Sequence, residues 1–452
     1  MEQNQLSTAF VGIIGRQVVK FRPIQYLVAA VAMVALVGVV PSPAFAQDAP
    51  DEQPPAEHHH HVVESSSTWT WSTDANVLAG YNYQDRRFAD FWAWESQNWG
   101  MVMAERQLGA GRLTLNGMIS LEPWTIGRLV YAHGLDGPER VYAFDSFGRQ
   151  QPIGGSPQAF QTGESYLGSP IINFQHPHDL FMGIGAKYRF TVGALKYAVE
   201  AALVGSPALG PTVYMHRESG RDNPSAPLTH HYLDSTHITP GVVTGGVGAG
   251  SMLFEASAFR GEEPDENRLN IEQPKLDSWS ARASWRHGPW DAQFSSGHLH
   301  VPEWFEPTDV TRLTASIGFN GAIGRRPLAA IVAWGQNREL GFALDGYLAE
   351  WDLRLSTANS IYGRGESVLK EIFGLGVHPA GLLNHPRNFS QINALTVGYV
   401  RELSFLGPGL GVGADVTVYD TSQDLVEYYG SPRSYHVFLR WRPNRTAPAH
   451  TH

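Results

Sequence analysis

The sequence predicts an all-β fold, a transmembrane antiparallel β-barrel of about 16 strands within a range of about 14–18. Three observations lead to this expectation. Short segments alternate between apolar and polar residues, the polar faces of these segments carry full charges, and the connections alternate between short and long. The predicted barrel has short periplasmic turns at one end and long extracellular loops at the other.

The alternation of side chains is clear in the segment 277–286, DSWSARASWR. Trp279 falls on its apolar face and Arg282 falls on its polar face. Successive side chains of a strand point to opposite faces of a sheet, so a period of two predicts a strand. The segments 180–190 and 410–419 show the same period.

The polar faces of the predicted strands carry charges that favour a barrel over a soluble sandwich. In an outer-membrane barrel the apolar face contacts lipid and the polar face lines the lumen. We therefore predict that the following charged residues line a pore: Lys187, Arg189, Lys196, Glu200, Arg282, Arg286, Asp415 and Arg440. Charged rings in a pore tune ion selectivity. The alternative is that these charges pair with one another and fill a narrow lumen.

The lengths of the connections also favour a barrel. We expect strands near residues 68–83, 96–107, 111–122, 179–190, 195–204, 236–247, 251–260, 277–287, 291–300, 309–319, 327–337, 344–356, 359–370, 392–404, 409–419 and 434–441. From the first strand onward every second connection is short, whereas the others, above all 123–178 and 205–235, are mostly longer. The segment 123–178 is the natural candidate for a constriction that folds into the lumen.

The ends of the chain indicate export. A basic stretch, an apolar run and Ala44-Phe45-Ala46 predict a signal peptide over residues 1–46, cleaved after Ala46. Residues 47–67 form a His-rich arm that cannot bury a core, residues 68–441 form the barrel, and residues 442–452 form a flexible tail. We therefore expect the protein in a bacterial outer membrane.

The composition of the chain limits the classes of partner that are expected. The formal net charge is −10 and the chain has no cysteine, so neither nucleic acid nor thiolate ligands are expected. The expected partners are outer-membrane lipid and small solutes or metal ions. Whether the barrel is a monomer or a homo-oligomer stays open.

Histidines gather at the predicted extracellular mouth, in loops that lie far apart in the sequence. Neutral imidazole binds zinc and copper, and carboxylates can complete the shell of ligands. The candidate metal ligands, for copper or zinc, are His176, His178, Asp179, His230, His231, Asp234 and His237. The run His58–His61 and the terminal His450 and His452 could hold metal loosely. The alternative for the loop histidines is an ordinary hydrogen-bonding role at the entry of a strand.

A hydrolytic site is the weaker alternative. Asp234, Ser235 and His237 include the residue types of a Ser-His-Asp triad. Neighbours in the chain seldom place nucleophile, base and orienting carboxylate in line, and the sequence has no G-x-S-x-G motif. We therefore predict that the protein is not an enzyme.

Four segments carry a resemblance to a known group of proteins. They are TGESYLGSPIINFQHPHDLFMGIGAKY, GSPALGPTVYMHRESGRDNPSAPLTHHYLDSTHITPGVVTGGV, FEASAFRGEEPDENRLNIEQPKLDSWSARASW and INALTVGYVREL. These segments, of which HPHDLF and HHYLDSTHIT are the most distinctive parts, resemble a little-characterised family of exported Gram-negative outer-membrane β-barrel proteins associated with copper and heavy-metal resistance. The resemblance extends from about Trp99 to Trp441 and implies an outer-membrane location and a link to metals. It assigns no functional residues. The N-terminal arm of this chain has a His run and lacks a Met-rich segment.

These observations predict a porin-like channel for small solutes or ions, linked to metal handling through histidines at the extracellular mouth. A metal-binding outer-membrane surface protein without an open pore is the first alternative. A barrel-embedded hydrolase is the second.

Overall fold

The computed structural model describes residues 68–134, 137–144, 147–167, 169–303, 307–371 and 389–443. The predicted signal peptide, the predicted His-rich arm and most of the predicted tail lie outside the described residues. No helix within the described ranges is long and apolar enough to cross a bilayer.

The predicted β-barrel is confirmed, because 16 antiparallel strands close into one sheet. Strand β1 pairs with β2 on one side and with β22 on the other, which closes the barrel. The strands are β1 (Thr70–Asp85), β2 (Asp90–Leu108), β3 (Gly111–Ile119), β10 (Phe181–Val192), β11 (Leu195–Gly205), β12 (Thr239–Ala249), β13 (Met252–Phe259), β14 (Ser278–His287), β15 (Trp290–Leu299), β16 (Val310–Ile323), β17 (Arg326–Glu339), β18 (Phe342–Arg354), β19 (Asn359–Glu371), β20 (Phe389–Glu402), β21 (Leu410–Thr421) and β22 (Arg433–Trp441). Each predicted strand has a counterpart, and β2 begins earlier than predicted.

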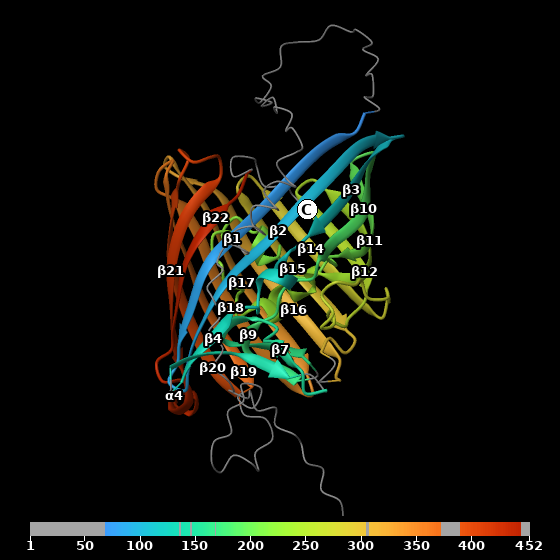
Figure 1. The fold of residues 1–452 in the computed structure, drawn as a ribbon. Coiled ribbons are helices and arrows are strands. Elements are labelled where there is room, and N and C mark those ends of the chain that lie inside the picture. The colour runs from blue at the N-terminus through green and yellow to red at the C-terminus, as the bar shows by residue number, and fades with distance from the viewer. Residues whose placement is uncertain are drawn as a thin grey trace, which may run out of the picture.

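Smaller elements occupy the long connections. Between β3 and β10 lie α2 (Glu122–Thr125) and the strands β4 (Val130–Gly134), β5 (Gly137–Arg140), β6 (Tyr142–Phe144), β7 (Gln150–Pro152), β8 (Ser156–Tyr166) and β9 (Ser169–Gln175). Between β11 and β12 lie η1 (Tyr214–His216), α3 (His230–Leu233) and η2 (Ser235–His237), and between β21 and β22 lies α4 (Gln423–Tyr429). In Figure 1 the labels β4, β7, β9 and α4 lie toward the lower end of the barrel, opposite the end where β1 begins.

The outer surface of the barrel is apolar, as the period-two pattern predicts. Trp279 is 54% exposed, and its neighbour Ser280 is buried on the inner side. The following outward side chains are also exposed: Val199, Leu203, Phe254, Phe294, Ile317, Val332, Tyr347, Leu395, Val397, Val416 and Val437. Aromatic side chains pair near both ends of the strands, as Tyr81 with Trp94 and Phe190 with Tyr197 show. The wall therefore presents an apolar belt between two aromatic zones.

One residue departs from the simple alternation. The period-two pattern of the segment 180–190 places Met182 on the outward apolar face, and this expectation is wrong. Register shifts lie between Phe181 and Gly183 on one side of β10 and between Ile184 and Gly185 on the other. Such bulges change which face a side chain occupies. Met182 is therefore buried inside, in a cluster with Trp99 and other residues.

The connection between β11 and β12, residues 206–238, crosses the interior of the barrel, and we call it the lumen segment. Its Asp222 accepts hydrogen bonds from Arg440 of β22 and from Arg442, each with an N–O distance of 3.0 Å. Its Arg217 donates to Glu350 of β18 at 3.1 Å. Ion pairs to β18 and to β22 therefore hold the lumen segment on separated parts of the wall.

Residues 156–175, the β8–β9 hairpin, also fold inward. Phe160 is fully buried in a cluster that includes Leu228 of the lumen segment and Tyr429 of α4. Gln158 donates to the carbonyl oxygen of Ala226 at 2.6 Å. The β8–β9 hairpin of the segment 123–178 thus folds into the lumen as expected, whereas β4 of that segment pairs with β2 of the wall. The lumen segment, predicted to be an outer loop, folds inward as well.

Candidate metal centre

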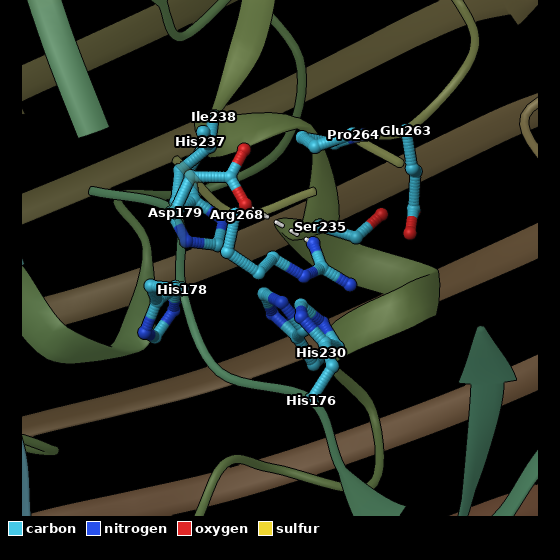
Figure 2. A pocket seen from close by; sticks show the side chains of 10 residues that line it. All are labelled: His176, His178, Asp179, His230, Ser235, His237, Ile238, Glu263, Pro264 and Arg268. Atoms are coloured by element: carbon cyan, nitrogen blue, oxygen red, sulfur yellow. Dashed lines mark hydrogen bonds and ion pairs between the residues drawn. The ribbon is translucent and has the colours of Figure 1, made fainter. Parts of the chain in front are cut away.

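A small cavity of about 20 Å³ lies where the lumen segment approaches the start of β10. That space holds one or two water molecules or a single ion. Four imidazole rings line it, together with Asp179, Ser235, Ile238, Glu263, Pro264 and Arg268 (Figure 2). The four rings belong to His176, His178, His230 and His237, and we call them the imidazole cluster.

His178 is held by a buried carboxylate. The Oε2 atom of Glu122 lies 2.7 Å from Nδ1 of His178 and accepts the backbone N–H of the same residue at 2.8 Å. Glu122 begins the one-turn helix α2 directly after β3, and only 2% of it is exposed. The carboxylate fixes the orientation of the ring and favours the proton on Nδ1.

His230 is held in the same way from within its own segment. Its Nδ1 atom lies 2.5 Å from Oδ1 of Asp234, four residues later, where helix α3 ends. The Oδ2 atom of Asp234 accepts from Arg217 at 2.6 Å and from the backbone N–H of Tyr214 at 3.1 Å. Burial alone raises the pKa of Asp234, but the charges of Arg217 and His230 outweigh it and lower the pKa to about 2. Asp234 is therefore a fixed negative charge at neutral pH.

The other two rings face backbone carbonyls. Nδ1 of His237 lies 3.0 Å from the carbonyl oxygen of Asp234, and Nδ1 of His176 lies 3.0 Å from that of Pro177. An oxygen acceptor at Nδ1 places the proton there and leaves Nε2 as the basic nitrogen. Within the described part of the chain, the Nε2 atoms of His178 and His237 are buried and have no hydrogen-bond partner.

The spacing of the ring centres suits a shared ion pair by pair, although no three potential ligand atoms of these rings lie within 4.8 Å of one another. The ring centres of His178 and His237 are 5.3 Å apart, and those of His230 and His237 are 5.1 Å apart. Two imidazoles on one tetrahedral zinc ion, with Zn–N bonds of about 2.0–2.1 Å, have ring centres about 5 Å apart. The ring centre of His176 lies 6.3 Å from that of His178.

The electrostatics favour neutral rings. Burial, assisted by the nearby charge of Arg268, lowers the pKa of His176 well below its usual value. Burial, assisted by His230 and His178, lowers the pKa of His237 in the same direction. Arg268 itself pairs with Asp179, with an N–O distance of 3.2 Å. His176 and His237 therefore offer neutral imidazoles, the protonation state that binds metal.

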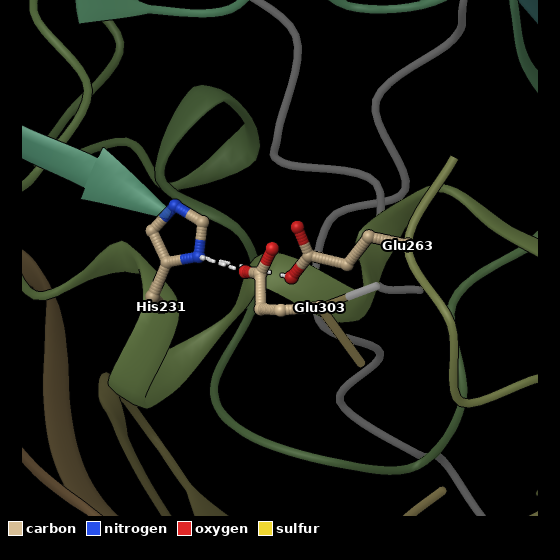
Figure 3. A group of neighbouring side chains, drawn as sticks. All are labelled: His231, Glu263 and Glu303. Atoms are coloured by element: carbon tan, nitrogen blue, oxygen red, sulfur yellow. Dashed lines mark ion pairs between the residues drawn. The ribbon is translucent and has the colours of Figure 1, made fainter. Parts of the chain in front are cut away.

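A second group of side chains lies beside the cavity. Among the described residues, His231, Glu263 and Glu303 are the one set of three whose potential ligand atoms all lie within 4.8 Å of one another (Figure 3). Nδ1 of His231 is 3.7 Å from a carboxylate oxygen of each glutamate. Glu263 also lines the cavity of the imidazole cluster.

The structure brings most of the predicted metal ligands together. Five of them line the cavity, namely His176, His178, Asp179, His230 and His237. His231 turns to the neighbouring glutamates, and Asp234 supports His230 from behind. They lie at the end of the barrel that carries the long connections, but His178 and His230 are 3% and 2% exposed. His178 and His230 are therefore enclosed within the protein, whereas His176 and His237 are partly exposed.

The residues of the predicted triad do not form a relay. The carboxylate of Asp234 contacts His230 and Arg217, whereas His237 meets only the backbone carbonyl of Asp234. The hydroxyl of Ser235 accepts a hydrogen bond from Arg312 at 2.8 Å. A nucleophilic serine needs a base at its proton and an orienting carboxylate behind that base. These contacts do not supply that arrangement.

Three acidic residues at the site escaped the sequence analysis. Glu122 follows β3, Glu263 follows β13 and Glu303 follows β15. Glu122 is 56 residues from His178 in the sequence, and Glu263 and Glu303 lie in other connections than His231, so no spacing within a motif could point to them. The one available signal is the alternation of long connections, which predicts that these loops meet at one end of the barrel.

The predicted pore-lining charges divide into two groups. Toward the short turns they are partly solvated, as in Lys187 with Glu200 at 3.1 Å and in Arg189 with Glu105 at 2.7 Å. Lys196 and Arg286 are exposed there, and Arg282 pairs with Glu255. By contrast, Arg440 and Asp415 are buried. Arg440 pairs with Asp222, and Asp415 contacts His436 with an O–N distance of 2.7 Å. Their role as pore-lining residues stays a prediction.

No family model matches the sequence, and no curated protein matches it. Solved structures are similar in fold. An anion-selective porin from Comamonas acidovorans matches 82% of this chain and 100% of its own, with 10% identity and a TM-score of 0.44. Salmonella typhi OmpF in complex with daunomycin matches 82% and 97%, with 10% identity and a TM-score of 0.46. Outer-membrane expressed OmpT of Vibrio cholerae matches 84% and 100%, with 8% identity and a TM-score of 0.43.

The buried imidazoles predict acid sensitivity of the metal-free protein. Because burial lowers the pKa of His176, His231 and His237 below about 6.5, the unfolded chain takes up protons that the folded chain refuses. The free energy of unfolding is therefore highest above about pH 6.5. It falls as the pH drops below that value, by up to about 1.4 kcal/mol per pH unit for each histidine. Protonation of Asp234 lowers the free energy of unfolding further only below about pH 4.

The measurement is urea unfolding of the protein in lipid vesicles between pH 7.5 and about pH 5, with chelator present. His237→Gln should flatten the dependence on pH by up to one proton. Identical slopes for the variant and the parent protein would contradict this account of the cluster.

Proposed function

We propose that this protein is an outer-membrane β-barrel that binds a transition metal ion, zinc or copper, through the imidazole cluster. One observation carries the proposal. Each ring has its Nδ1 atom on an oxygen acceptor, and the Nε2 atoms of His178 and His237 are buried without a partner in the described structure. Metal-ligating histidines show this pattern of an acceptor at the other nitrogen.

The membrane location is supported by the wall itself. A closed barrel satisfies all of its backbone hydrogen bonds internally, which a bilayer requires. The exposed apolar belt between aromatic zones suits hydrocarbon flanked by lipid head groups. The predicted signal peptide and the resemblance to exported barrel proteins support the same location.

A purely structural role explains the imidazole cluster less well. A buried nitrogen without a hydrogen bond costs about 1–3 kcal/mol. His178 and His237 each have such a nitrogen, and their ring centres are 5.3 Å apart. In a purely structural role, nothing would offset this cost. A bound metal ion supplies the missing partner of both nitrogens at once.

The ligand set favours Zn(II) or Cu(II) over Cu(I). Imidazole suits zinc and copper, whereas Cu(I) prefers thiolates and thioethers. Met215 could have provided a thioether, but it packs in the apolar cluster with Trp99 and Met101. The side chains at the cavity offer nitrogen and oxygen atoms.

The test is titration of the refolded, full-length mature protein with Zn(II) and Cu(II), with His58–His61 replaced by alanine in every sample. His178→Ala with His237→Ala should weaken binding of one ion by at least about 100-fold, and Glu122→Gln should weaken it about 10–100-fold by releasing His178. His298→Ala, a half-exposed histidine on Asp309, is the matched control and should change nothing. Unchanged affinity in the double variant would remove the cluster as the site.

A channel activity is the second candidate, because the inner wall toward the short turns carries solvated charges. Lys187, Glu200 and Arg189 are each partly exposed there. Such a lining suits passage of ions. We propose that the lumen segment restricts this passage, since it crosses the barrel and its ion pairs attach it to separated parts of the wall. On this account the protein is a binding protein and a restricted channel rather than an enzyme.

Conductance in planar bilayers tests the restriction. The parent protein should conduct weakly or rarely, and Asp222→Asn should raise conductance, because the variant takes a charge partner from both Arg440 and Arg442. Glu105→Gln, which alters a partly exposed pair with Arg189, is the carboxylate control and should not have this effect. Large steady conductance steps in the parent protein, unaltered by Asp222→Asn, would show an open pore instead.

A further inference from the structure

A second set of ligand-type side chains lies beside the imidazole cluster and differs from it in chemistry. His231, Glu263 and Glu303 bring one imidazole nitrogen and two carboxylate oxygens within 4.8 Å of one another (Figure 3). They come from three different parts of the chain, namely helix α3 in the lumen segment, the β13–β14 connection and the β15–β16 connection. Their convergence is therefore a product of the fold and not of local sequence.

The distances within this group fit ligands around an ion. Nδ1 of His231 lies 3.7 Å from Oε1 of Glu263 and 3.7 Å from Oε1 of Glu303. A hydrogen bond between these atoms would be about 2.7–3.2 Å long. Ligands that share an ion at about 2.0–2.2 Å lie about 3.0–3.6 Å apart. The atoms thus face one another at a separation too long for a hydrogen bond and close to that of a shared metal.

The backbone holds the group in place. The backbone N–H of Glu263 donates to the carbonyl oxygen of Pro302 at 3.0 Å, which ties together the two connections that carry the glutamates. The side chain of Asn337 on β17 donates to the carbonyl oxygen of His231 at 3.0 Å. A site built on supports of this kind keeps its ligands near the geometry of binding.

The group is partly enclosed by the protein. The side chains of Glu263 and Glu303 are only 10% and 21% exposed. Arg312 interacts electrostatically with both glutamates, and Lys370 interacts with Glu303. The carboxylate oxygens and the imidazole nitrogen supply ligand atoms of the kind that a divalent cation takes.

We propose that His231, Glu263 and Glu303 form a second divalent-cation site, of harder ligand character than the imidazole cluster. Two carboxylates and one imidazole suit Mn(II), Fe(II) or Zn(II), and carboxylates in particular accept Mn(II). The existence of this site does not depend on the imidazole cluster. Its role as a neighbour of a first metal site does rest on the proposed function.

The relation between the two sites follows from Glu263, which belongs to both. Glu263 lines the cavity of the imidazole cluster and also faces His231. The side chain of His231 is 13% exposed, whereas that of His230 is 2% exposed. His231 is therefore more exposed than His230, whereas His176 and His237 of the imidazole cluster are partly exposed as His231 is.

The experiment uses Mn(II) as the probe, followed by the loss of the electron paramagnetic resonance signal of the free ion. The full-length mature protein with His58–His61 replaced by alanine should bind one Mn(II). Glu263→Gln and Glu303→Gln should each weaken Mn(II) binding at least about 10-fold, because each removes a charged ligand. Glu262→Gln is the matched control, since Glu262 pairs with Arg260 on the same connection.

The two sites are separated by a crossed comparison. His178→Ala with His237→Ala should leave Mn(II) binding unchanged, whereas loss of Mn(II) binding in that double variant would place the ion in the imidazole cluster and overturn the proposal. Absence of Mn(II) binding in the parent protein, or unchanged binding in both glutamate variants, would also overturn it. A failure of the imidazole cluster would appear separately, as Zn(II) affinity that the double variant does not alter.

Heat-modifiable migration in electrophoresis checks that each variant has folded. If Glu263→Gln does not fold, Glu303→Gln decides the outcome alone. Its side chain is the more exposed of the two, so its replacement disturbs packing least.

Discussion

The carboxylate of Asp234 joins the candidate metal centre to the barrel wall. One of its oxygens holds His230 at 2.5 Å and the other accepts Arg217 at 2.6 Å. Arg217 in turn contacts Glu350 of β18, which also pairs with Arg364 of β19. The orientation of an imidazole in the lumen segment therefore depends on a chain of charges that ends in the wall.

Burial of these charged side chains is unfavourable unless each of them keeps its partners. Taking a charge out of water costs several kcal/mol, and a buried pair recovers that cost only when its geometry and its further hydrogen bonds are good. Asp222 meets that condition, because both of its oxygens accept from Arg440, and Arg442 donates to it as well. Buried pairs of this kind specify one position of the lumen segment more than they add net stability. A defined position is what a ligand set drawn from several loops requires.

Much of the fold follows from the sequence because a strand in a barrel wall has a simple rule. Trp279 outward and Arg282 inward could be predicted from a period of two, and the strand count could be predicted from alternating connections. Met182 could not be placed, because a bulge in β10 depends on pairing with β3 and β11. Local sequence carries no signal for that register shift.

The candidate site was only partly predictable for a different reason. Residue type and the shared end of the barrel were enough to bring His176, His178, His230 and His237 into one set. The partners of these rings depend on how separate connections pack. Glu122 is a lone acid after β3, and its contact with His178 spans 56 residues of sequence. Inward folding of the lumen segment is likewise decided by ion pairs with distant strands.

X-ray absorption at the zinc edge of the Zn(II)-loaded, full-length mature protein, with His58–His61 replaced by alanine, tests the central claim most directly. Binding by the imidazole cluster predicts a first shell of nitrogen at about 2.0–2.1 Å, with the outer-shell scattering of two or more imidazole rings. That scattering should disappear in the variant His178→Ala with His237→Ala. A first shell without imidazole scattering, or a spectrum that the double variant leaves unchanged, would contradict the claim that these buried histidines hold the metal.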